Sequence, residues 1–145
     1  MQDEGQDKQE DLIHFDLTKK ILKCCFEVMN TLGIGFLESV YKNSLVVAMV
    51  ENGLKVSTDR GFEVVFHDRK VGVFIPDLIV ENAVIVELKS CENLLAEHQA
   101  QLINYLAVTD VQVGLLVNFG KRKLEYKRLH HPAYHASYHP DPVPF

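Results

Sequence analysis

The sequence lacks the features that mark several common protein classes. No apolar run approaches the roughly 20 residues needed to cross a bilayer, which predicts a protein with no membrane span. The first residues, MQDEGQDKQED, are acidic and polar, unlike a signal peptide. The chain has no Cys-x-x-Cys pair for zinc, no glycine-rich loop ending in Lys-Ser or Lys-Thr, and no serine-hydrolase elbow. These absences argue against zinc modules, nucleoside triphosphatases and serine hydrolases.

Cysteine is scarce, and its positions suit a reducing compartment. Cys24 and Cys25 are adjacent within a helical pattern, and Cys91 stands alone. We interpret all three as small apolar packing residues and expect a cytoplasmic protein. The formal net charge of −5 argues against charge-driven binding of nucleic acid over a wide surface. This charge does not exclude a local site. Carboxylates that bind cations count as negative in the formal charge, but the bound cations neutralise them.

The length of 145 residues fits one domain with a single core. Residues 1–11 are predicted to form a disordered polar tail, 12–129 the folded domain, and 130–145 an irregular tail rich in histidine and proline. Asp16 is a candidate cap for the first helix, and Gly33 is its expected stop. Periodicity predicts helices at about 16–32, 37–52 and 94–108, and strands at about 62–66, 71–73, 77–80, 83–89, 111–118 and 123–128.

This order of elements predicts an α/β domain with a mixed sheet covered by helices. Strand 111–118 follows a crossover helix, so it should lie parallel to a strand of the preceding meander. Strand 83–89 is apolar on both faces until its end, which is typical of a central strand.

Two charged residues, Glu87 and Lys89, stand at the end of that central strand and share one face. Whether Asp77 joins them depends on the hairpin register. A two-residue turn would place Asp77 opposite Val86, facing away from Glu87. A three-residue turn or a β-bulge would place Asp77 directly opposite Glu87. Only the second arrangement can make a site, so the chemistry predicts an odd turn or a bulge.

Two opposed carboxylates repel each other unless a cation lies between them. Such oxygen ligands suit Mg²⁺ or Mn²⁺, and a neighbouring lysine can orient water or hold a phosphate. The competing interpretation is a surface Glu–Lys pair and an aspartate that simply begins a strand. Spacing alone does not separate the two.

The motifs resemble those of the PD-(D/E)XK nuclease superfamily, since Pro76-Asp77 and Glu87-Leu88-Lys89 match its signature. Gly35-Phe36-Leu37-Glu38-Ser39-Val40-Tyr41 is similar to the motif of the GxxExxY protein family, which is placed in that superfamily. Further similarity lies in AQLINYL, residues 100–106, and in GLLVNFG, residues 114–120. The resemblance covers about residues 14–128.

The resemblance implies a restriction-endonuclease-like fold, in which a mixed β-sheet is flanked by α-helices, and it implies roles for particular residues. Asp77 and Glu87 correspond to the metal-binding carboxylates, with the Leu88 carbonyl as another ligand. Lys89 corresponds to the water-orienting lysine. Glu38 matches a helix glutamate that holds the metal through water, and Gln101 matches a glutamine near the scissile phosphate.

We therefore expect a Mg²⁺- or Mn²⁺-dependent nuclease acting on DNA or RNA. The alternative is a catalytically inactive module of the same fold that binds nucleic acid or a protein partner, and a homo-oligomer is a further possibility. Tyr41 is expected to pack or orient, and Asn118 to stabilise the turn at Gly120. The third helix carries a polar stripe, for which a solvated face is the competing interpretation and the preferred one for Glu97 and Asn104; the stripe comprises Glu97, His98, Gln101, Asn104 and Tyr105. A basic cluster near the last strands could hold a nucleic-acid backbone, and strand-end lysines that discourage edge pairing explain it almost as well; the cluster comprises Lys121, Arg122, Lys123, Lys127 and Arg128.

Overall fold

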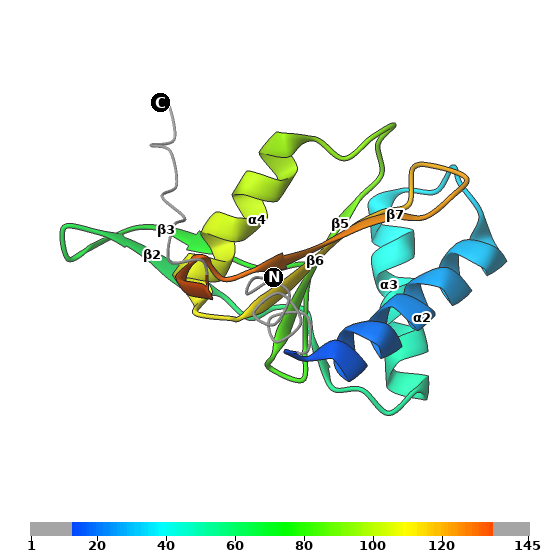
Figure 1. The fold of residues 1–145 in the computed structure, drawn as a ribbon, viewed down its shortest axis with the longest axis horizontal. Coiled ribbons are helices and arrows are strands. Elements are labelled where there is room, and N and C mark those ends of the chain that lie inside the picture. The colour runs from blue at the N-terminus through cyan, green and yellow to red at the C-terminus, as the bar shows by residue number, and fades with distance from the viewer. Residues whose placement is uncertain (1–12, 135–145) are drawn as a thin grey trace, which may run out of the picture.

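A mixed five-stranded sheet forms the centre of the computed structural model, which describes residues 13–134 (Figure 1). Parallel pairing joins its third and fourth strands, and the other pairs are antiparallel. Strand 111–118 thus lies parallel to a meander strand, as expected, and strand 83–89 is central. The order across the sheet is β1 (Val56–Ser57), β4 (Leu78–Val80), β5 (Val84–Lys89), β6 (Val113–Asn118) and β7 (Glu125–His130).

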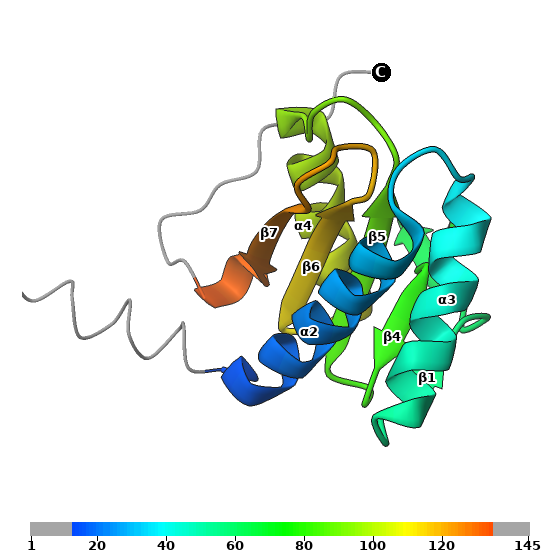
Figure 2. The same cartoon turned by 90° about the vertical axis from the view of Figure 1, so that its right-hand side faces the viewer.

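Helices cover both faces of the sheet (Figures 1 and 2). One face packs against α2 (Phe15–Leu32) and α3 (Glu38–Glu51). The other packs against α4 (Ala96–Thr109) and a hairpin of β2 (Phe62–Phe66) and β3 (Arg69–Phe74). This arrangement confirms the restriction-endonuclease-like α/β fold class.

Alternation along the strands produces two separate cores. In β5, Val84, Val86 and Leu88 face α2 and α3, whereas Ile85 faces the α4 side with Leu102. Glu87 and Lys89 are in phase with Ile85, so they leave the sheet on the α4 face. The alternation predicted from sequence thus decides which helix layer lies beside the charged residues.

Several predicted boundaries differ from the structure. The first helix begins at Phe15 after His14, so Asp16 lies in its first turn and is not its cap. Gly33, with φ 71°, follows the end of the helix as predicted. The β2–β3 hairpin forms its own two-stranded sheet instead of continuing the meander.

The last strand lies at 125–130, not at 123–128, because pairing with β6 begins only at Asn118–Glu125. A short 3-10 helix, η1 (Pro132–Tyr134), follows within the segment that was expected to be irregular. The predicted tail over 1–11 lies outside the described residues. Across residues 13–134, no helix has the length and apolarity that a membrane span requires.

Candidate metal centre

The β4–β5 hairpin has the odd connection that a site requires. Val80 pairs with Val84, so Glu81, Asn82 and Ala83 lie between the strands. Glu81 and Asn82 both have φ 53°, and the Ala83 N–H donates to the Val80 carbonyl at 3.0 Å. The tight turn thus spans two central residues, and Ala83 is the extra residue that shifts the register.

This register, continued by one position from Leu78–Val86, places Asp77 opposite Glu87. Two hydrogen bonds lock the pair together. The Asp77 N–H donates to Glu87 Oε1 at 3.1 Å, and the Leu88 N–H donates to Asp77 Oδ2 at 2.9 Å. Within the described residues, no N–H group donates to the second oxygen of either carboxylate, and the two side chains interact with each other. Those two oxygens remain available to a cation.

The environment of Glu87 disfavours its charged form. Burial in the sheet and the neighbouring Asp77 carboxylate together raise the pKa of Glu87 from 4.5 to about 8, and the Asp77 N–H hydrogen bond and the Lys89 charge offset this only in part. In the cation-free protein, Glu87 is therefore protonated near neutral pH. A bound cation would replace that proton.

The backbone at Leu88 adds a third oxygen to the pair. The Lys89 carbonyl accepts from the Phe119 N–H at 2.9 Å, so the backbone groups of Lys89 point toward β6. Because successive residues alternate in direction, the backbone groups of Leu88 point toward β4. The residue opposite Leu88 by register is Pro76, which has no N–H. The ladder therefore offers the Leu88 carbonyl no donor from that position.

Two carboxylates and a carbonyl fit a Mg²⁺-type ion that keeps several waters. The described part of the chain contains no group of three His, Cys, Asp or Glu side chains arranged around a common point. Glu38 thus does not join Asp77 and Glu87 directly, and the predicted link through water is compatible with that separation.

Glu38 nevertheless reaches the same end of the sheet. It is the first residue of α3, and its Oε1 accepts the Ser90 N–H at 3.2 Å. Ser90 follows Lys89 directly, so an exposed acid from α3 is held beside the end of β5. This contact brings together parts of the chain 52 residues apart.

The Tyr41 side chain holds the loop that positions Glu38 at this end of the sheet. Its side chain is fully buried, and its hydroxyl donates to the Gly33 carbonyl at 2.6 Å and accepts from Phe36 N–H at 3.2 Å. Its ring stacks on Phe119 with a centroid separation of 4.7 Å. The Tyr41 side chain thus fixes the loop that delivers Glu38, as its expected orienting role requires.

Tyr41→Phe should lower the free energy of unfolding by about 1–3 kcal/mol, because the Gly33 carbonyl and the Phe36 N–H lose their shared partner in partly buried hydrogen bonds. Urea denaturation would measure the change. Tyr126→Phe is the matched control, since Tyr126 is 42% exposed, and it should alter stability by less than about 0.5 kcal/mol. Equal effects of the two changes would contradict the orienting role.

Gln101 does not contact the carboxylates. It lies exposed on α4, on the layer that faces them, one turn before Tyr105. Tyr105 stacks on Phe74 at 3.6 Å, so it belongs to the packing of the hairpin and not to a solvated stripe. His98 accepts the Leu95 N–H through Nδ1 and thus closes the first turn of α4.

A comparison with known protein families gives a match over most of the chain. The model of the PD-(D/E)XK nuclease superfamily matches residues 15–129, which include both strands of the acidic hairpin. The chain belongs to the PD-(D/E)XK nuclease superfamily. The matched range contains Asp77 and Glu87.

A solved structure gives the same fold. The crystal structure of SSO0001 aligns with a TM-score of 0.51 at 18% identity, over 65% of this chain and 50% of the other. This chain therefore spans about half the length of that protein. A comparison with curated proteins gave no match. The superfamily assignment thus comes from the family model, and the structural match supports the fold.

One buried residue of this superfamily member has a larger role than the sequence indicated. Asn118 donates to the Cys91 carbonyl at 2.9 Å and accepts from the N–H groups of Cys91 and Gly120 at 3.0 and 2.9 Å. The bond to Gly120 was expected, whereas the bonds to Cys91 join loops 27 residues apart. Asn118 pairs with Lys89 in the sheet, so it anchors the site loops.

Cys91 itself corrects a prediction. Cys24 and Cys25 are buried in the core as expected. Cys91 is only half-buried, and its Sγ donates to the Asn93 carbonyl at 3.2 Å. It is therefore a loop residue near the site and not a core packing residue.

Glu87→Gln should make the cation-free protein more stable at high pH. A folded pKa raised above the unfolded value means that stability is present below pH 4.5 and is lost as pH rises through about 8. Glutamine can still accept the Asp77 N–H but carries no charge. In EDTA, we expect a gain on the order of 2 kcal/mol at pH 9 and little change at pH 4.

Urea denaturation at pH 4, 7 and 9 would measure this difference. Glu92→Gln is the matched control, because Glu92 is exposed and lies just beyond β5. A pH-independent effect of Glu87→Gln would show that neither burial nor Asp77 raises the pKa of Glu87.

Proposed function

We propose that the protein is a Mg²⁺- or Mn²⁺-dependent nuclease that hydrolyses phosphodiester bonds in DNA or RNA. One observation carries the proposal. Asp77 and Glu87 oppose each other on one face of the sheet, and each has an oxygen to which no N–H group of the described residues donates. Membership of the superfamily supports the same activity.

Each predicted residue has a role that its position supports. Asp77, Glu87 and the Leu88 carbonyl would hold the cation, with Glu38 acting through water. The cation would stabilise negative charge that develops on the phosphate. Lys89 leaves β5 on the same face as Glu87 and would orient the attacking water. Gln101, on the helix layer over that face, would contact the phosphate once substrate is bound.

We further infer that the chain falls within the GxxExxY family. The support is the arrangement of its motif, in which Gly35 has φ 108°, Glu38 reaches Ser90, and Tyr41 fixes the intervening loop. Each residue that names the motif therefore has a physical task in one structure. Glu38 and Tyr41 are three positions apart, which is about one helical turn, so the two side chains lie on the same side of α3.

A second function is favoured by two observations. Gln101 has no contact with the carboxylates, and the described residues provide only two acids around the candidate position. A catalytically inactive module that binds nucleic acid or a protein partner would have these properties. The three free cysteines agree with a cytoplasmic location, and a homo-oligomer remains a prediction for light scattering to test.

The test uses the purified full chain with labelled single- and double-stranded DNA and RNA. We expect cleavage with Mg²⁺ or Mn²⁺ and none in EDTA. Cleavage that continues in EDTA would contradict the proposed metal site. Complete inertness on all four substrates with either ion would overturn the nuclease and favour the binding module.

A further inference from the structure

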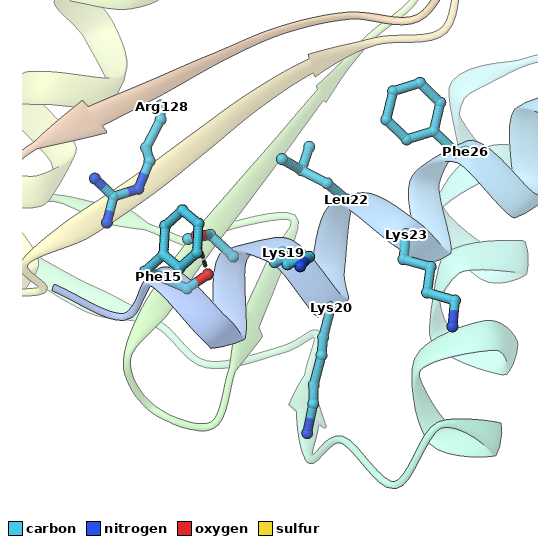
Figure 3. Close-up of a pocket in the computed structure, with 8 residues that line it drawn as sticks. Phe15, Lys19, Lys20, Leu22, Lys23, Phe26 and Arg128 are labelled. Carbon is cyan, nitrogen blue, oxygen red and sulfur yellow. Dashed lines mark hydrogen bonds between the residues drawn. The ribbon is translucent and has the colours of Figure 1, made fainter. Parts of the chain in front are cut away.

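A second surface of the molecule concentrates positive charge, although the chain as a whole is acidic. A hollow of about 720 Å³ lies between α2 and β7, and four cations line it: Lys19, Lys20, Lys23 and Arg128. Figure 3 shows Arg128 extending from β7 toward Phe15, with Lys20 and Lys23 projecting from the rim of the helix away from the sheet. The floor is mainly apolar, and the rim is basic.

A neighbouring hollow of about 440 Å³ extends this surface along β7 and is lined by Lys121, Lys123 and Lys127. Phe26 lines the first hollow and Tyr126 the second, and their rings meet edge to face at 6.2 Å. The two hollows are therefore adjacent. Together they hold seven of the 15 lysines and arginines in the chain, with Glu125 the one acid in their linings. We call this surface the basic track.

Exposed aromatic rings follow the basic track. Phe15, Phe26 and Tyr126 are 49%, 41% and 42% exposed. Rings of this kind, placed between cations, can stack unpaired bases while the cations hold phosphates. A duplex hides the faces of its bases, so the combination favours a single strand.

The basic track reaches the same end of the sheet as the candidate metal centre. The loop after β6 carries Lys121, whose Nζ donates to Asn93 Oδ1 at 2.9 Å in the loop after β5. Asn118, at the end of β6, pairs with Lys89 in the sheet. A strand lying on the track would therefore reach the end of the sheet where Lys89 and Glu38 lie.

We propose that the basic track binds single-stranded nucleic acid and leads it to the metal centre. The identity of this ligand rests on the proposed function. A second copy docked through the same surface is a poor occupant, because the basic rims of the two copies would face each other. The acidic residues 1–11 are a possible competitor, and the test below separates them from nucleic acid.

The test measures binding of labelled oligonucleotides by fluorescence anisotropy in EDTA, in an Asp77→Asn background that removes cleavage. Lys19→Glu/Lys23→Glu alters the first hollow and Lys123→Glu/Lys127→Glu the second. We expect each pair to weaken single-strand binding at least tenfold, and to reduce the slope of log K against log salt by about 1.4. Lys55→Glu/Arg69→Glu is a control of equal charge at exposed positions away from the track, expected within twofold.

Three results would overturn the proposal: parent-like affinity in either track variant, equal affinity for duplex and single strand, or a tenfold gain in affinity on removal of residues 1–11. The last would identify those residues as the occupant. The outcome is independent of the nuclease assay. Binding on the track without cleavage would refute the nuclease alone, and cleavage with unaltered binding in both variants would refute the track alone.

Discussion

Asp77→Asn should reduce metal-dependent cleavage at least ~100-fold, or by about 3 kcal/mol of transition-state stabilisation. Asparagine retains an oxygen that can accept the Leu88 N–H, so the hydrogen bond of 2.9 Å is preserved while the charge is lost. The fold should therefore survive, and the cation should not bind. Initial rates on a labelled oligonucleotide, with and without Mg²⁺, would measure the effect.

Thermal unfolding provides a readout that does not depend on activity. A ligand at 100 times its Kd stabilises the folded state by about 2.7 kcal/mol, and this gain should disappear in Asp77→Asn. Glu92→Gln is the control, since it removes a nearby exposed carboxylate and should keep both cleavage and stabilisation. Parent-like cleavage by Asp77→Asn would show that the activity belongs to another site or to a contaminant.

Gly120→Ala should destabilise the protein by about 3 kcal/mol. A Cβ at this position would lie 2.3 Å from both the backbone nitrogen and the carbonyl oxygen of Cys91, and 2.8 Å from the Ser90 carbonyl carbon. Backbone atoms cannot rotate aside as a flexible side chain can. The loop after β5 must move, and with it the Ser90 N–H that holds Glu38.

Gly72→Ala is the matched control for this change. An added Cβ at Gly72 meets nothing within 4 Å, so stability should stay within about 0.5 kcal/mol of the parent. Urea denaturation of the two alanine variants would measure the difference. Similar stability of both variants would mean that the two loops do not pack as closely as described.

The sequence was sufficient to predict the hairpin geometry because one chemical condition selected one register. Asp77 and Glu87 can share a cation only if the connection is odd, and the bulge at Ala83 provides this. Periodicity likewise predicted the central strand and its parallel neighbour, since apolar residues on both faces leave few other positions.

The sequence could not predict contacts that depend on distant parts of the chain. The bonds from Asn118 to Cys91 and from Glu38 to Ser90 span 27 and 52 residues, and no local pattern encodes them. The two-residue strand β1 is too short for any periodicity. The basic cluster was recognised as charge, but the hollows beside α2 arise only when β7 packs next to that helix.

Pro76 ends the β4–β5 pairing because its ring leaves no backbone N–H to donate. Any other residue there would carry an N–H able to close one more rung with the Leu88 oxygen, and zipping of the two strands would continue past Asp77. The pyrrolidine ring makes that closure impossible at every temperature and pH. Substitution of this one buried residue would therefore let the Leu88 carbonyl accept a hydrogen bond from β4 instead of binding the cation. The hairpin would become more rigid, and its affinity for the ion would fall.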